Sequence, residues 1–149
     1  MRAKLVAVFL PIFIIVAGWL FFETNGSYQL SFKAKFYYEI GNFDEAFKLS
    51  QRALELDNYN KMASTLVNQS KIALKFTAYI NDGKKYLQNI KQMSQNEVSN
   101  ADRERIRLMC EIMIEGYSQL QDSPLLDSDL KNEAKNMREN FVKLKNKLF

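Results

Sequence analysis

The chain has 149 residues, and its 21 lysine and arginine residues exceed its 17 aspartate and glutamate residues by a formal net charge of +4. This modest excess contains no arginine cluster interleaved with aromatic residues, which argues against a nucleic-acid-binding protein. Because 47% of the residues are hydrophobic and only two are proline and five glycine, the composition excludes a disordered chain and predicts an all-α protein.

An uncharged apolar segment, residues 5–22, follows the basic residues Arg2 and Lys4. As a helix it would cover about 27 Å, close to the roughly 30 Å of a bilayer's hydrocarbon core. The basic residues precede the segment and Glu23 follows it. The positive-inside rule therefore predicts that residues 1–24 are a cytoplasmic start and a single transmembrane anchor in the bacterial inner membrane, with the rest periplasmic. The marker residues of this anchor are Leu5, Pro11, Trp19, Phe21 and Phe22.

Two other interpretations of this segment are open, and a third is excluded. A cleaved signal peptide would use the small residues at 16–18 as its cleavage site, but the apolar run continues beyond them to Phe22, which favours an uncleaved anchor. No cysteine follows the run, so a lipoprotein anchor is excluded. A reversed anchor, with the remaining chain in the cytoplasm, is the second alternative.

Residues 27–60 have the pattern of two helices joined by a short turn. Apolar residues recur at steps of three and four up to Ile40, and Gly41 supplies the left-handed conformation that ends a helix. Asn42 can cap a second helix over about residues 43–57. The expected buried face of that second helix consists of Phe43, Ala46, Phe47, Ser50, Ala53 and Leu54.

This segment resembles a tetratricopeptide repeat, a helix pair of 34 residues. Counted from Ser27, the matches are a small eighth residue, an aromatic eleventh, the turn and the end of the second helix: Ala34, Tyr37, residues 41–46 and residues 53–57. Leu30 stands where the family prefers tryptophan, and Asn58 where it has a closing proline. A generic helical hairpin would explain the apolar spacing but not the turn and the ending.

The resemblance also implies where a partner would bind. In this family the first helix of each pair lines a concave groove that holds an extended peptide or a partner helix. The corresponding groove residues here are Tyr28, Ser31, Lys35, Tyr38, Glu39, Thr65, Gln69 and Ile72. Members that clamp a terminal carboxylate have lysine and asparagine where this chain has Ser31 and Lys35, so that specificity is not expected. The alternative for the tyrosines is packing against the next helix or the anchor.

Beyond Asn60 the helical periodicity continues while the repeat signature fades. Residues 61–80 predict one helix, Asn-Asp-Gly at 81–83 predicts a turn, and residues 84–93 predict a short helix. Residues 61–94 would thus form a degenerate second helix pair.

Residues 101–149 would form two further helices that pack on or cap the repeat. The periodicity places these helices at about 101–121 and 128–148, separated by a turn around Pro124. The last helix carries a seam that could pack within the chain or pair with a partner: Leu130, Ala134, Met137, Phe141, Leu144 and Leu148.

Catalysis is not expected from these residues. The chain has no histidine, which removes the commonest general base and metal ligand. Its single cysteine, Cys110, lies on the apolar face of a predicted helix, and no glycine-rich phosphate loop occurs. We therefore expect no cofactor, no metal ion and no small-molecule substrate.

The leading functional hypothesis is a non-enzymatic protein-protein interaction adaptor or scaffold, anchored in the inner membrane with a periplasmic helical domain. Such a protein would be an accessory subunit of an envelope machine, such as a flagellar motor or a secretion or translocation complex. The alternative is a periplasmic chaperone-like factor that holds client proteins near the membrane.

Overall fold

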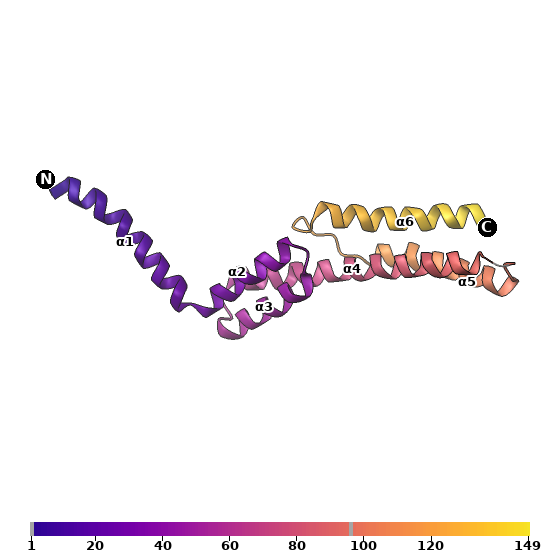
Figure 1. The fold of residues 1–149 in the computed structure, drawn as a ribbon, viewed down its shortest axis with the longest axis horizontal. Coiled ribbons are helices and arrows are strands. Elements are labelled where there is room, and N and C mark those ends of the chain that lie inside the picture. The colour runs from indigo at the N-terminus through magenta and orange to yellow at the C-terminus, as the bar shows by residue number, and fades with distance from the viewer. Residues whose placement is uncertain (1, 96) are drawn as a thin grey trace. The chain divides into compact units, whose positions relative to one another are not determined.

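The computed structural model describes residues 2–95 and 97–149, and it describes side chains from residue 10 onward except at residues 21, 22 and 96. Within these ranges all regular structure is helical, which confirms the all-α prediction. The helices, labelled in Figure 1, are α1 (Arg2–Thr24), α2 (Gly26–Glu39), α3 (Phe43–Leu56), α4 (Lys61–Met93), α5 (Asn100–Ser118) and α6 (Ser128–Leu148). They divide into two compact units, residues 1–70 and 71–149.

The helix α1 contains Pro11 and carries exposed apolar side chains. Those of Leu10, Ile12, Phe13, Ile14, Ile15, Val16, Trp19 and Leu20 are each 47–71% exposed. Among the described residues, no helix combines the length and the apolar character needed to cross a membrane. Of the predicted anchor residues, Leu5, Phe21 and Phe22 lie outside the described side chains. The anchor therefore stays a prediction.

The helices α2 and α3 form the predicted hairpin. Gly41 between them has a positive φ of 79°, and the Asn42 side chain accepts a hydrogen bond from the Glu45 N–H, so the predicted stop and cap are both confirmed. Small residues with no exposed surface let the two helices approach closely: Ala34, Ser31, Ala46, Ser50 and Ala53. Of the other residues predicted on the buried face of α3, Phe43, Phe47 and Leu54 are half-buried, whereas Leu49 is buried and was not predicted.

A buried polar cluster joins the start of α4 to this hairpin. The side-chain oxygen of Asn60 caps α4 by accepting from the Ala63 N–H at 3.1 Å, and the side-chain NH2 group donates to the hydroxyls of Ser27 at 2.8 Å and Ser31 at 3.0 Å. Ser27 in turn donates to the Ala53 carbonyl at 2.8 Å. The repeat-like unit thus ends in a hydrogen-bond network centred on Asn60, two residues after the position where the tetratricopeptide family has its closing proline.

The prediction of a turn at residues 81–83 was wrong. A single helix of 33 residues, α4, continues through it, so the predicted second helix pair does not form. Gly83 is buried in the middle of α4, where a Cβ atom would lie 2.6 Å from Met137 Cγ and 2.9 Å from Met113 Cε. The glycine is therefore required by the close approach of side chains from α5 and α6, and not by a turn.

The second unit consists of residues 71–93 of α4 together with α5 and α6. The helix α5 ends at Ser118, three residues before the predicted end, and α6 has the predicted bounds. Of the apolar seam on α6, Ala134, Met137 and Phe141 are buried. The same helix reaches α5 through ion pairs from Lys145 to Glu111 at 2.9 Å and from Lys131 to Asp122 just beyond α5 at 2.7 Å, which makes α5 and α6 antiparallel.

Candidate functional site

The groove residues implied by the repeat resemblance do not all face solvent. Ser31 was expected to touch a partner, but it has no exposed surface and its hydroxyl lies in the Asn60 network, so it cannot make that contact. Tyr28 and Tyr38 are half-buried, and the ring of Tyr38 packs edge-on against Phe43 with 5.3 Å between centroids. Tyr38 therefore packs against the next helix, α3, as the alternative interpretation of the tyrosines expected.

The other implied residues are spread over both units. Lys35, Glu39 and Thr65 are exposed, and Gln69 is half-buried, all in the first unit. Ile72 is half-buried and belongs to the second unit. A partner site on these residues stays a prediction, without Ser31 among its contacts.

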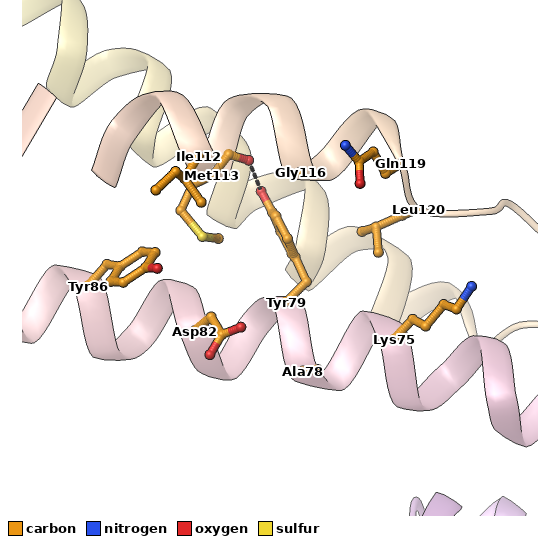
Figure 2. Close-up of a pocket in the computed structure, with 10 residues that line it drawn as sticks. All are labelled: Lys75, Ala78, Tyr79, Asp82, Tyr86, Ile112, Met113, Gly116, Gln119 and Leu120. Carbon is orange, nitrogen blue, oxygen red and sulfur yellow. Dashed lines mark hydrogen bonds between the residues drawn. The ribbon is translucent and has the colours of Figure 1, made fainter. Parts of the chain in front are cut away.

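A groove of about 400 Å³ lies between α4 and α5 in the second unit, and Figure 2 shows the side chains that line it. Its α4 wall is built from residues three or four apart, which places them on one helix face. The two walls consist of Lys75, Ala78, Tyr79, Asp82 and Tyr86 on α4, and of Ile112, Met113 and Gly116 on α5 with Gln119 and Leu120 at its end. Both walls are therefore helix faces, and the groove follows two antiparallel helices.

Tyr79 forms the floor of this groove. Its hydroxyl donates to the Met113 carbonyl at 2.8 Å, as the dashed line in Figure 2 marks, and only 8% of the residue is exposed. Burial raises the pKa of Tyr79 from 10.0 to about 12, so the phenol is neutral at physiological pH. Gly116 leaves room for this ring, because a Cβ atom there would lie 3.7 Å from the ring of Tyr79. Tyr79 thus fixes the spacing of α4 and α5.

The rim of the groove carries one charge of each sign. Lys75 and Asp82 are exposed on the same face of α4, seven residues or roughly 10 Å apart. Neither forms an ion pair with another described residue. Between them and α5 the surface is apolar, with Ile112 45% exposed. The groove therefore combines an apolar centre with two fixed charges at a set separation.

A second cavity of about 480 Å³ lies at the other end of the same unit. Its lining is mostly apolar and carries charge of one sign only, from Arg103. The lining residues are Ile90, Ser94, Val98, Arg103, Ile106, Leu144, Leu148 and Phe149. Because two fixed charges of opposite sign set the direction in which a partner binds, the groove between α4 and α5 is the stronger candidate for specific recognition.

The single cysteine takes no part in either cavity. Cys110 has no exposed surface, and burial raises the pKa of its thiol, which keeps the sulfur protonated and weakly nucleophilic. In the described part of the chain, no three acidic or sulfur-containing side chains are placed to hold a metal ion.

Sequence reasoning missed the groove because it ended a helix at residues 81–83. The signal was nevertheless present: Lys75, Tyr79, Asp82 and Tyr86 follow one another at steps of four, three and four, which is the spacing of one continuous helix face. That periodicity runs through the turn-like Asn-Asp-Gly without interruption.

Comparison with known proteins finds no relative of this chain. Neither a protein-family model, nor a curated protein, nor a solved structure matches the chain. The likeness of residues 27–60 to a tetratricopeptide repeat therefore rests on the hairpin itself.

Proposed function

We propose that this protein is a non-enzymatic adaptor, anchored in a bacterial inner membrane by its first helix, whose periplasmic second unit holds a helix of a partner protein. The observation that carries the proposal is the groove between α4 and α5, with its apolar centre and its two unpaired rim charges. An amphipathic helix fits such a groove because its apolar face can cover Ile112 and Tyr86 while its polar face stays in water.

The rim charges define the chemistry of the partner helix. An acidic side chain opposite Lys75 and a basic side chain opposite Asp82 would be required, two helical turns apart. A helix with the reverse order of charges would bind in the opposite direction along the groove. The membrane anchor would raise the local concentration of the adaptor near a membrane-bound partner, as expected of an accessory subunit in an envelope complex.

Support for the anchor comes from the apolar side chains of α1, which are exposed at eight described positions between residues 10 and 20. In water such a surface would be unfavourable, since these side chains are only partly covered and the full burial of a large apolar side chain is worth about 1.5 to 3 kcal/mol. A bilayer would bury this surface.

Crosslinking in intact cells tests the adaptor role. A photoreactive residue at Ile112 should give one dominant crosslinked protein, identified by mass spectrometry, whereas the same residue at Lys85, exposed on the outer side of α4, should give none. Lys75→Glu should reduce the yield at Ile112, because the reversed charge would repel the acidic partner residue.

The alternatives give different products in the same experiment. A dominant product at Tyr38 with none at Ile112 would overturn the groove proposal and favour the α2 surface. Many unrelated products at Ile112 would favour the chaperone-like alternative over a dedicated adaptor.

A further inference from the structure

The outer face of α2 carries bulky apolar side chains. Phe32, Phe36 and Ile40 follow one another at steps of four, and they are 52%, 61% and 58% exposed. The opposite face of the helix, with Ser27, Ser31 and Ala34, is buried against the rest of the first unit. A helix on a water-covered surface normally places polar residues where these three lie. The face defined by Phe32, Phe36 and Ile40 is called the α2 outer face below.

The end of α1 lies on the same side of α2 as this face. The Gln29 amide donates to the Glu23 carbonyl at the end of α1 at 2.9 Å. Gln29 precedes Phe32 by three residues and Phe36 by seven, so all three share one side of the helix. The helix α1 therefore leaves the first unit from the side on which the apolar face is exposed.

The chain changes direction between the two helices. Asn25 has φ −103° and ψ 86°, which interrupts the helix, and its side chain accepts from the Tyr28 N–H to start α2. Figure 1 shows α2 turning away from the direction of α1. A helix that changes direction directly after a membrane-spanning segment can lie along the membrane surface when it carries an exposed apolar face.

From this geometry we infer that the α2 outer face lies in the headgroup region of the bilayer, so that the first unit rests on the membrane along α2. The inference rests on the proposed anchor, since it requires α1 to lie in the bilayer. Phenylalanine and isoleucine at steps of four would enter the boundary between headgroups and acyl chains. Lys33 and Lys35 are exposed on the two flanks of this face and can extend their charged ends to lipid phosphates, whereas Glu39 lies at the distal end.

Quenching of tryptophan fluorescence by brominated lipid tests the contact. The chain has one tryptophan, Trp19, so a Trp19→Phe background allows a single tryptophan to be placed elsewhere. The full chain would be reconstituted into nanodiscs of phosphatidylcholine and phosphatidylglycerol, with or without bromine on the acyl chains. Phe36→Trp should lose fluorescence in the brominated lipid, and Ile40→Trp provides a second position if the first variant fails to fold.

The matched control is Lys48→Trp. Lys48 is exposed on the face of α3 that points away from the hairpin core, and thus away from α2. Its tryptophan should not be quenched. The wild-type chain, with only Trp19, reports separately whether α1 enters the bilayer.

The outcomes separate the inference from the anchor. Quenching at Trp19 and at position 36 or 40, but not at position 48, supports the inference. Quenching at Trp19 alone overturns it and leaves the anchor standing. Equal quenching at positions 36 and 48 also overturns it. No quenching at Trp19 overturns the anchor and the inference together.

Discussion

One buried amide group connects three helices of the first unit. The Asn60 side chain caps α4 and bonds Ser27 and Ser31 on α2, and Ser27 reaches the Ala53 carbonyl near the end of α3. Only 1% of Asn60 is exposed, so its polar atoms have exchanged water entirely for protein partners. Removing one side chain from such a network takes a hydrogen-bond partner away from polar groups that stay buried. The free-energy cost is then larger than the contribution of a single hydrogen bond.

Replacing Asn60 with alanine should therefore destabilise the first unit. We expect Asn60→Ala to lower the free energy of unfolding by about 1 to 3 kcal/mol, through the lost cap and the loss of the amide that donates to the buried hydroxyls of Ser27 and Ser31. Urea denaturation of the full chain, followed by circular dichroism, measures the change. Asn58→Ala, an exposed position in the same turn, should be nearly neutral. Equal effects of the two variants would contradict the network.

A second residue-scale prediction concerns Tyr79 and pH. Because its pKa is raised from 10.0 to about 12, the unfolded chain loses the phenolic proton first as the pH rises. The folded state holds the Tyr79 proton between these values, so the contribution of Tyr79 to stability is constant below pH 10 and falls between pH 10 and about 12. The stability relative to Tyr79→Phe should fall by about 2 kcal/mol over this window, so that the variant becomes the more stable protein near its upper end.

Denaturation of both proteins at a series of pH values isolates this effect, because every other ionisable group is common to the two proteins. At neutral pH the variant should be less stable by about 1 kcal/mol, the value of a typical hydrogen bond. A difference that stays constant up to pH 12 would show that the Tyr79 phenol is not held neutral.

Among the elements, α4 shows how tertiary packing overrides a local signal. Asn-Asp-Gly is a turn sequence, yet the helix continues through it, and Met113 and Met137 occupy the space beside Gly83. Helix propensity alone favours alanine over glycine by about 1 kcal/mol. At this position the side chains of α5 and α6 leave no room for the extra methyl group.

Alanine substitutions at two glycines should consequently change the stability of the second unit in opposite directions. Gly83→Ala should destabilise the second unit by about 1 to 3 kcal/mol, because overpacking exceeds the gain in helix propensity. Gly116→Ala should be neutral or stabilising by up to about 1 kcal/mol, since its Cβ atom would meet the Tyr79 ring at an ordinary 3.7 Å. Thermal unfolding of both variants measures the contrast. Similar stabilisation by both would mean that the methionines move aside freely.

At the scale of the whole molecule, local patterns predicted the helices better than the surfaces. The stop at Gly41, the cap at Asn42 and the bounds of α6 depend on neighbours in sequence, and all agree with the structure. The turn-like residues 81–83 do not reveal the continuity of α4, whereas the spacing of Lys75, Tyr79, Asp82 and Tyr86 does. The side chains packed against Gly83 come from residues 30 and 54 positions further along the chain. The burial of Ser31 likewise follows from its bond with Asn60, which a comparison of repeat positions does not include.

The two compact units share α4, because the boundary between residues 70 and 71 falls inside that helix. A chain cut there would leave each piece with only part of the helix and an exposed end. Fragments meant to fold separately would therefore have to overlap, the first extending to residue 93 and the second starting at residue 60 with the capping asparagine. No limited digestion at an interdomain loop can yield such a pair, so the independent folding of either unit has to be studied with recombinant fragments that duplicate α4.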